Sequence, residues 1–458
     1  MRYISTRGNS PPRSFAEILL SGLAPDGGLY MPETWPQIPA SEIAGFSNKP
    51  YTAVAHAIVK RFIGDSLSES ELKADIDAAY KPFEARDVVP LMQIAPDQWL
   101  LELFHGPTFA FKDIAMQLIA RLSARALAKR GGRATILAAT SGDTGSAAIA
   151  AFGGLANIDV FVLHPKGRVS DVQRRQMTTT PHANVHNIAI EGTFDDAQAI
   201  VKDLFAEIDF VERAGLVAVN SINFARIIAQ SVYYFVAAAK LGIPPTFVVP
   251  TGNFGDVFAG EAAMRMGLQI EKLIVATNEN DIVARALHTG LYSPGEVRQT
   301  LSPSMDIQVA SNFERALFEA SGRNSAWLRN AMAQFAKTRS LVLPPVVLSN
   351  LRTRYEAMRV SDEETLQTIA RFYQGNRAFI DPHTAVALAA NKKREQGGWT
   401  VILSTAHPAK FPAAVSKAAG ISPPLPPRLA DLYERAERVS VLPADKASIR
   451  QFIEDRLG

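Results

Sequence analysis

From about residue 96 onward, short apolar runs alternate with segments of helical periodicity. This alternation constrains the fold strongly, because buried strands separated by helices form parallel sheets that helices cover on both faces. The pattern therefore predicts an α/β fold. The expected strands lie at 133–139, 159–163, 187–190, 216–219, 247–249, 273–276 and 401–403, and helices are expected at 113–128, 194–205 and 223–241.

The length and composition indicate a large globular protein. The chain has 458 residues, which is beyond the size at which one hydrophobic core keeps growing, so we expect at least two lobes. Hydrophobic residues make up 47% of the chain and argue against extended disorder. The 48 basic and 45 acidic residues nearly balance, so we expect neither a nucleic-acid partner nor a membrane partner.

The residue inventory also narrows the chemistry. The chain has no cysteine, which excludes disulfides, thiolate catalysis and cysteine metal sites. The eight histidines show no metal-binding spacing, and we interpret His182 and His186 as loop residues, so no metal site is predicted. Residues 1–14 lack an apolar signal-peptide core and no run approaches transmembrane length, so a cytoplasmic protein is expected.

The segment 105–113, His-Gly-Pro-Thr-Phe-Ala-Phe-Lys-Asp, places Lys112 at the start of an expected helix. The lysine stands behind a Gly-Pro turn and between aromatic residues, an arrangement that suits an amine kept from bulk water. Burial disfavours the ammonium form and lowers the pKa, which makes a lysine nucleophilic. Taken alone, the segment is better explained as a solvated Lys-Asp pair at a helix start, because most lysines are exposed.

Two further segments change that interpretation. Residues 245–260 contain an apolar run, a Gly-Asn-Phe-Gly turn and then a helical pattern, which is how backbone N–H groups and a helix dipole form a phosphate cradle. Residues 139–148, Ala-Thr-Ser-Gly-Asp-Thr-Gly-Ser-Ala-Ala, follow another apolar run and open another helix. Hydroxyls and free N–H groups at a helix start suit a carboxylate ligand, although, taken alone, Asp143 and Thr144 are better explained as plain N-caps.

Together these segments resemble the fold-type II pyridoxal phosphate (PLP) enzymes, which have a tryptophan synthase β-like fold, and within them the threonine synthase family. The resemblance runs over nearly the whole chain, and several motifs in the right order make it specific. Its other segments are 3–8 (Tyr-Ile-Ser-Thr-Arg-Gly), 22–32 (Gly-Leu-Ala-Pro-Asp-Gly-Gly-Leu-Tyr-Met-Pro), 220–226 (Asn-Ser-Ile-Asn-Phe-Ala-Arg) and 404–411 (Ser-Thr-Ala-His-Pro-Ala-Lys-Phe).

The resemblance implies two doubly wound, open-sheet lobes and an N-terminal layer. Residues 1–95 would form the layer, residues 126–219 the small α/β lobe, and residues 96–125 and 220–458 the large PLP-binding lobe. Residues 295–375, with a mostly helical pattern, would belong to a C-terminal elaboration of the large lobe.

The resemblance also implies the site residues. Lys112 would bind PLP covalently and act as the catalytic proton carrier. The cofactor would further be held by Gly252, Asn253, Phe254, Gly255, Asp256 and Thr405, of which Thr405 faces the pyridine nitrogen. The substrate would be held by Ser141 and Thr144 at its carboxylate and by Asn220, Ser221 and Arg226 at a second phosphate. The orientation of Asp256, the exposure of Lys410 and the partner of the PLP ring hydroxyl stay open.

The implied activity is the PLP-dependent conversion of O-phospho-L-homoserine and water to L-threonine and phosphate, by a monomer or homodimer. Alternatives on the same fold are a phospholyase or a threonine/serine dehydratase, which does not need the second phosphate grip. A non-catalytic PLP- or amino-acid-binding protein is a different class, against which the intact Lys112 argues. A nicotinamide-dependent dehydrogenase is disfavoured because residues 142–145 lack the G-x-G-x-x-G spacing.

Overall fold

The computed structural model describes residues 1–217, 221–394 and 397–457. An N-terminal layer begins with strands β1 and β2, which pair antiparallel. Ser68 and Glu71 form a capping box that starts the last helix of the layer, because each side chain bonds the other's backbone N–H. The elements of the layer are β1 (Tyr3–Ser5), α1 (Phe15–Leu19), β2 (Tyr30–Pro32), α2 (Ala40–Ala44), α3 (Tyr51–Ile63) and α4 (Glu69–Tyr80).

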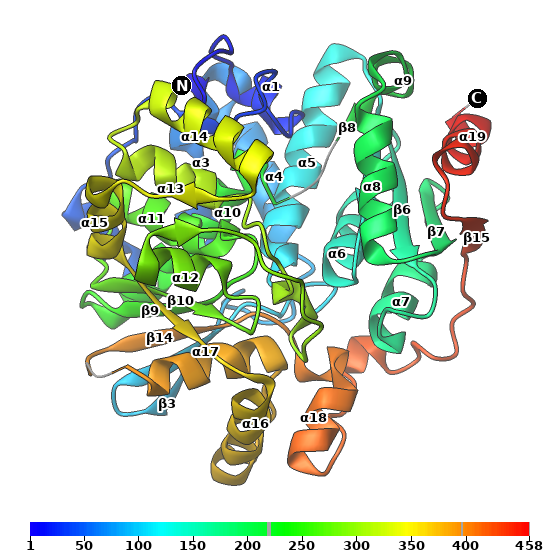
Figure 1. Ribbon diagram of the computed structural model, residues 1–458. Helices are drawn as coiled ribbons and strands as arrows, with labels where there is room; N and C mark the ends of the chain where they lie inside the picture. Colours follow the sequence, from blue (N-terminus) through cyan, green and yellow to red (C-terminus); the bar gives the residue numbers. More distant parts are fainter. Residues whose placement is uncertain (218–220, 395–396, 458) are drawn as a thin grey trace.

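A six-stranded sheet forms the core of the larger lobe, on the left of Figure 1. Its strands run in the order β13-β10-β9-β14-β4-β3, and every neighbouring pair is parallel except β3 and β4. The predicted strands near 247, 273 and 401 are thereby confirmed. The strands are β3 (Leu91–Ala95), β4 (Gln98–Glu102), β9 (Thr246–Pro250), β10 (Lys272–Thr277), β13 (Tyr355–Arg359) and β14 (Thr400–Ser404).

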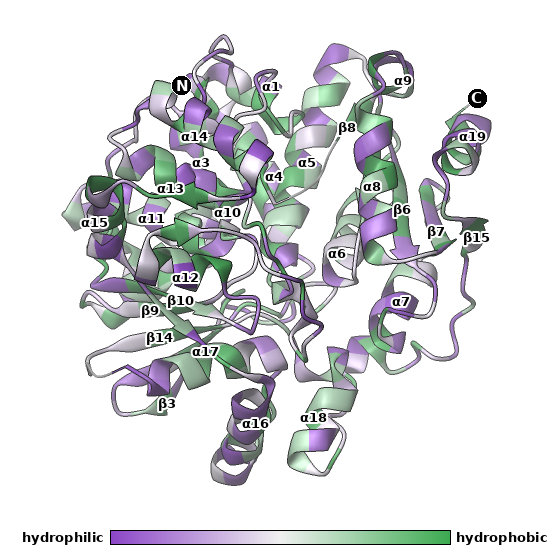
Figure 2. Ribbon diagram, viewed as in Figure 1, coloured by the Kyte–Doolittle hydropathy of each residue, from purple (hydrophilic) through white to green (hydrophobic). Residues whose placement is uncertain are grey.

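Helices cover both faces of this sheet because successive residues of its central strands point to opposite sides. Phe247 and Val249 join the core shared with α10 and α11, whereas Val248 joins the core beneath α17. In Figure 2, α17 carries hydrophobic turns while α16, further from the sheet, is largely hydrophilic. The helices of this lobe are α10 (Phe224–Leu241), α11 (Gly255–Arg265), α12 (Ile282–Thr289), α13 (Phe313–Ala320), α14 (Ser325–Thr338), α15 (Pro345–Arg354), α16 (Asp362–Asn376), α17 (Pro382–Lys392) and α18 (Pro412–Ala419), and β11 (Leu291–Tyr292) pairs with β12 (Leu341–Val342).

A second, five-stranded sheet forms the smaller lobe on the right of Figure 1. Its order is β15-β7-β6-β5-β8 and all its pairs are parallel. Its strands are β5 (Ala134–Ala139), β6 (Ile158–Pro165), β7 (Val185–Glu191), β8 (Leu216–Val217) and β15 (Ser440–Pro443), and its helices are α6 (Asp143–Phe152), α7 (Asp171–Thr178), α8 (Phe194–Phe205), α9 (Ile208–Ala214) and α19 (Lys446–Leu457). The last two residues of the predicted strand 216–219 lie outside the described residues.

Four details differ from the sequence-based expectations. Residues 1–95 were expected to form the N-terminal layer, yet β3, at 91–95, pairs with β4 in the six-stranded sheet of the larger lobe. The segment 440–457 was assigned to the large lobe, yet β15 pairs with β7, and Ile449 and Ile453 of α19 lie in the apolar core of the five-stranded sheet. The mostly helical region 295–375 also contains β13, which extends the other sheet beside β10. His186, expected in a loop, lies in β7, where its ring stacks on Phe161 at 4.6 Å between centroids.

Helix α5 (Lys112–Arg130) lies between the two lobes (Figure 1). Its low amphipathicity follows from this position, because residues on most of its circumference are buried, including Ile114, Met116 and Leu118. The helix ends at Arg130, and Gly131, which caps it, adopts the left-handed conformation that favours glycine. Lys112, its first residue, is thereby placed where the lobes meet.

The packing of α6 against its sheet depends on Gly145. A Cβ atom at this position would lie 2.4 Å from Cγ2 of Thr140, and 2.9 Å from both Sδ of Met177 and Cγ1 of Val162. The N–H of Gly145 also donates to Oγ1 of Thr140 over 2.9 Å. The absence of a side chain therefore lets the start of α6 approach the strand loop closely.

We expect Gly145→Ala to lower the free energy of unfolding by about 1–3 kcal/mol, because overpacking forces the neighbouring atoms to move. Urea denaturation followed by circular dichroism measures this change. The matched control is Gly375→Ala in α16, where no atom lies within 4 Å of the added Cβ and where alanine is expected to stabilise by about 0.5–1 kcal/mol. Equal effects of the two substitutions would contradict the packing argument.

Candidate active site

The candidate site lies at the carboxyl ends of strands from both sheets. The loop Gly252–Phe254 follows β9, Ser141 follows β5, and Thr405 follows β14. Open α/β sheets bind ligands at this edge, because the connections that leave the strands there can diverge around a ligand. Lys112 reaches the same place, since the N–H of Phe111 donates to the carbonyl of Thr405 over 2.8 Å.

The amine of Lys112 is largely withdrawn from solvent, with 12% of its side chain exposed. Its Nζ lies 3.5 Å from Oδ2 of Asp143 and 5.1 Å from the centre of the Phe111 ring. Burial lowers the pKa of Lys112; Asp143 opposes this effect, and the positive charges of Lys410 and Arg226 add to it. The structure thus places the amine in surroundings that favour its neutral, nucleophilic form.

Asp143 is the carboxylate at the centre of this group. Burial by itself would raise its pKa, but the ammonium groups of Lys410 and Lys112 and a hydrogen bond from Gln173 hold the pKa well below its usual range. The amide of Gln173 donates to Oδ1 over 2.8 Å, and Oγ of Ser304 lies 3.4 Å from Oδ2. Asp143 also begins α6, where the helix dipole favours a negative charge. The carboxylate is therefore ionised.

Lys410 is buried, with only 1% of the residue exposed, and lies within the site. Its Nζ contacts Oδ1 of Asp143 at 2.8 Å and donates to the carbonyl of Thr108 over 2.7 Å. The sequence left the exposure of this lysine open. The sequence offers only a weak signal: Lys410 stands six residues after the last residue of a buried strand, between Pro408 and Pro412 and amid apolar neighbours.

The loop after β9 has the form of a phosphate cradle. Phe254 adopts a left-handed backbone conformation, with φ of 63°, directly before α11. The N–H groups of Gly255 and Asp256, in the first turn of that helix, have no helical carbonyl to bond. A Cβ on Gly252 would lie 2.7 Å from the carbonyl oxygen of Ser304. A glycine at this position therefore lets two backbone segments meet beside the cradle.

Asp256 turns its carboxylate away from the loop and towards α10. Oδ1 accepts hydrogen bonds from the hydroxyls of Tyr233 and Tyr234, the latter over 3.0 Å. Oδ2 is buried and has no hydrogen-bond partner within the described part of the chain. Burial raises the pKa of Asp256 to about 6, against the lowering effects of both tyrosines and Lys112. The carboxylate thus anchors α11 to α10. The orientation of the Asp256 side chain, which the sequence left open, is away from the loop.

The predicted binding site for a second phosphate, at residues 220, 221 and 226, lies next to the loop after β9. Arg226 is 4% exposed, and its Nη1 has no hydrogen-bond partner among the residues that the structure describes. Burial lowers the pKa of Arg226 to about 10. An unpaired buried guanidinium is costly, so this group is available for an anion. Asn220, the third predicted member, lies outside the described residues.

Ser221 is connected to the loop after β9 through Ser311 and Asn312, the two residues that precede α13. Its hydroxyl lies 3.4 Å from that of Ser311, which donates to Oδ1 of Asn253 over 3.1 Å. The amide of Asn312 donates to the carbonyls of Ser221 and Asn253, over 2.9 and 3.2 Å. The contributions of Ser311 and Asn312 were not foreseen, because the two loops they join are remote from them in sequence.

Ser141 and Thr144 lie at the N-terminal end of α6, beside Asp143. Both are only partly buried, so their hydroxyls stand where a ligand carboxylate could meet the start of the helix. Thr405 is buried at 6% exposure and follows β14 directly. The structure thus brings the described site residues from the two lobes to one region.

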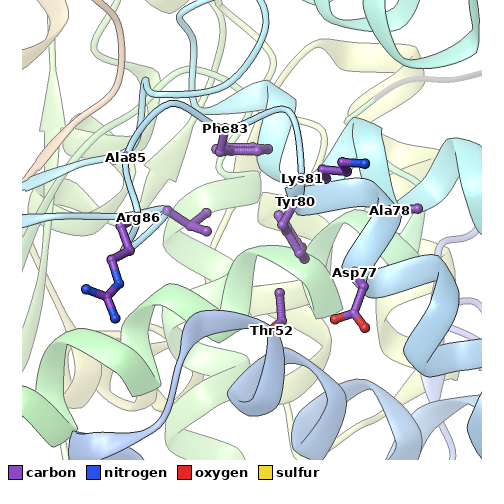
Figure 3. Close-up of a pocket in the computed structure, with 9 residues that line it drawn as sticks. Thr52, Asp77, Ala78, Tyr80, Lys81, Phe83, Ala85 and Arg86 are labelled. Carbon is purple, nitrogen blue, oxygen red and sulfur yellow. The ribbon is translucent and has the colours of Figure 1, made fainter.

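An open surface pocket lies elsewhere in the described structure. It has a volume of about 480 Å³ and is formed by α3, α4 and the segment after α4, as Figure 3 shows. Its lining includes Thr52, Asp77, Tyr80, Lys81, Phe83 and Arg86. None of the predicted site residues lines it, so it is distinct from the candidate site.

Two other kinds of feature are absent from the described part of the chain. None of its helices combines the length and the hydrophobicity that a membrane span needs. The same residues contain no cluster of histidine and carboxylate side chains that could hold a metal ion.

The residues present fit a PLP cofactor. A withdrawn amine, a glycine loop at a helix start and a buried hydroxyl at a strand end are the groups that would hold its aldehyde, phosphate and ring nitrogen. The buried, unpaired Nη1 of Arg226 adds a place for a second anionic group.

Comparison with known proteins supports this interpretation over the full chain. Family models match at residues 2–80 (threonine synthase N terminus), 93–346 (pyridoxal-phosphate dependent enzyme) and 384–453 (threonine synthase, C-terminal). A threonine synthase from Pseudomonas aeruginosa is 49% identical over 99% of this chain and 98% of its own length. One from Schizosaccharomyces pombe is 41% identical over 91% of this chain and 89% of its own length.

Solved structures agree. A PLP-bound threonine synthase from Brucella melitensis superimposes with a TM-score of 0.97 at 47% identity, covering 100% of this chain and 99% of that one. The yeast threonine synthase gives a TM-score of 0.94 at 38% identity, covering 100% and 98%. A threonine deaminase from Solanum lycopersicum shares only the fold, with a TM-score of 0.52 at 14% identity over 85% of this chain and 96% of that one.

The fold and the lysine-centred site are those of a fold-type II, PLP-dependent enzyme, so the predicted fold class and cofactor are confirmed. Within that class, the matches at both ends of the chain and the full-length relatives are specific. The chain belongs to the threonine synthase family.

The raised pKa of Asp256 predicts a pH-dependent stability. Its folded pKa of about 6 exceeds the unfolded value, so its favourable contribution is present below about pH 4 and is lost as the pH rises through about 6. Asp256→Asn should therefore gain stability relative to wild type by up to about 3 kcal/mol between these pH values.

Urea denaturation of both proteins, freed of cofactor, at several pH values measures this difference. The control is Asp203→Asn, which removes an exposed carboxyl group of α8. A stability difference between wild type and Asp256→Asn that does not change with pH would contradict the assignment.

Proposed function

We propose that this chain is a threonine synthase that converts O-phospho-L-homoserine and water to L-threonine and inorganic phosphate, the last step of threonine biosynthesis. The observation that carries the proposal is that two groups lie close enough for the charge of one to act on the other: the withdrawn amine of Lys112 and the buried guanidinium of Arg226, whose Nη1 is unpaired. An amine suits PLP chemistry, whereas a free guanidinium suits a substrate that carries its own phosphate.

The cofactor is held by residues of both loops and of α5. Lys112 would bind it covalently, the loop Gly252, Asn253, Phe254, Gly255 would hold its phosphate, and Thr405 would offer a neutral hydroxyl to its ring nitrogen. Asp256 supports this loop through Tyr233 and Tyr234. When bound, PLP supplies an electron sink for negative charge that develops on the carbon atoms of the amino-acid substrate.

The remaining chemistry belongs to the residues of this chain. The start of α6, with Ser141 and Thr144, orients the substrate carboxylate. Nζ of Lys112 takes and returns protons at the α and β carbons, for which a flexible amine of lowered pKa is suited. Ser221, Arg226 and Asn220 hold the substrate phosphate and stabilise its charge as it leaves the γ carbon.

A phosphate grip next to the cofactor cradle favours this reaction over threonine or serine dehydration. The bonds from Asn312 to Ser221 and Asn253 hold the two loops side by side. A dehydratase substrate has no phosphate to fill the second grip, so the unpaired guanidinium would stay without a partner. For the same function we propose a cytoplasmic location, a monomer or homodimer and the lobe boundaries given above, with 91–95 moved to the large lobe and 440–457 moved to the small lobe.

Product analysis tests the proposal directly. Incubation of the PLP-loaded enzyme with O-phospho-L-homoserine should release phosphate and form L-threonine in equal amounts. Lys112→Ala should lower kcat by at least about 10³-fold, because the amine is the covalent attachment point and the proton carrier. Lys417→Ala, at an exposed lysine of α18, is the control and should match wild type. Deamination of threonine without turnover of phosphohomoserine would contradict the substrate assignment.

Arg226→Met should lower kcat/KM for O-phospho-L-homoserine by about 10–100-fold, because a hydrogen-bonded charge on the substrate phosphate loses its partner. Steady-state kinetics with phosphate detection measure the change, and PLP absorbance shows that the cofactor is still bound. Arg168→Met removes an exposed arginine and serves as the control. Unchanged kinetics in Arg226→Met would argue against a role for this residue at the substrate phosphate.

A further inference from the structure

Two lysines share one buried carboxylate in this site. Oδ1 of Asp143 lies 2.8 Å from Nζ of Lys410, and Oδ2 lies 3.5 Å from Nζ of Lys112. Asp143 is 4% exposed and Lys410 is 1% exposed, so bulk water does not screen the charges. The shorter distance shows that Lys410 is the closer partner of the carboxylate.

The Asp143–Lys410 pair is held from both lobes. Asp143 starts α6 of the smaller lobe, and Lys410 belongs to a short 3₁₀ helix, Pro408–Lys410, that follows β14 of the larger sheet. Nζ of Lys410 also donates to the carbonyl of Thr108, and its own carbonyl accepts a hydrogen bond from Ser170 over 3.1 Å. Gln173 binds the same carboxylate oxygen as Lys410. Both charges are therefore fixed in place.

The charge balance around Lys112 follows from its neighbours. The charged side chains that act on it are Asp143 from α6, Lys410 from the 3₁₀ helix, Arg226 from α10 and Asp256 from α11. Without Lys410, the Asp143 carboxylate would have Lys112 as its remaining ammonium partner and would favour the charged amine. Without Asp143, Lys410 and Lys112 would be like charges in one buried space, which would favour the neutral amine.

We propose that Lys410 is a positioning residue of this enzyme: it binds and neutralises the Asp143 carboxylate, so that Lys112 is left as a free amine able to react with the cofactor aldehyde and to carry protons. The inference rests on the proposed function, because it assigns Lys112 that reaction. Lys410 acts through Asp143. The pair sets the pH at which Lys112 becomes reactive, and the two substitutions that break it shift that pH in opposite directions.

The experiment measures the reactivity of Lys112 in the full-length chain after removal of PLP with hydroxylamine. The probe is 2,4-dinitrofluorobenzene, which reacts with neutral amines; labelling of Lys112 is quantified by peptide mapping across pH 6–11. We expect Lys410→Met to raise the midpoint of labelling by about one pH unit or more, and Asp143→Asn to lower it. Lys410→Arg keeps the positive charge and should leave the midpoint near that of wild type.

Lys417→Met, at an exposed lysine of α18, is the matched control and should change neither the midpoint nor turnover. Circular dichroism and the urea midpoint show whether each variant folds. If Lys410→Met does not fold, the labelling midpoint of Asp143→Asn still tests the inference. A midpoint that stays the same or falls in Lys410→Met, or that rises in Asp143→Asn, would overturn the inference. The wild-type enzyme from the same preparation is also assayed for threonine formation. If it forms threonine, such a result overturns the role of Lys410 and not the proposed function.

Discussion

The common direction of the parallel strands decides where each group of the site lies. β5, β9 and β14 are buried on both faces, and their side chains alternate between two apolar cores, so only the connections at the strand ends are free to bind ligands. Because these strands present their carboxyl ends to the region between the lobes, loops more than a hundred residues apart in sequence meet there. Helix α5 carries Lys112 to the same region.

Within that region, the structure keeps several charges out of water without pairing all of them. Asp143 is paired twice and bonded by Gln173, whereas Nη1 of Arg226 has no partner among the described residues. Buried charges persist only where they are compensated or where a ligand completes them. The bonded carboxylate of Asp143 therefore lies fixed beside the amine of Lys112, and the unpaired guanidinium nitrogen is suited to the anionic ligand that we propose. Asp256 has a different task, since it joins α11 to α10 below the cradle.

Much of the secondary structure could be predicted because it depends on local pattern. The apolar runs near 134, 247 and 273 and the capping residues Ser68 and Thr193 determine strands and helix starts nearly to the residue. The strand β13 and the pairing of β15 with β7 could not be predicted, because short strands at sheet edges have weak patterns and their partners are remote in sequence. The burial of Lys410 depends in the same way on α7 and the segment at Thr108.

The sequence by itself determined the α/β class and, through ordered motifs, the family, and it predicted a nucleophilic lysine and a glycine loop for a phosphate. These features are local, since residue type and spacing already express them. Only the tertiary structure decided that Asp143 and Lys410 form a pair and that Asp256 faces Tyr233 and Tyr234. It also decided that Asn312 joins Ser221 to the loop after β9. Each of these contacts joins elements that come together only when the sheets are buried. The residues involved are remote in sequence, so the spacing within one segment does not predict their contact.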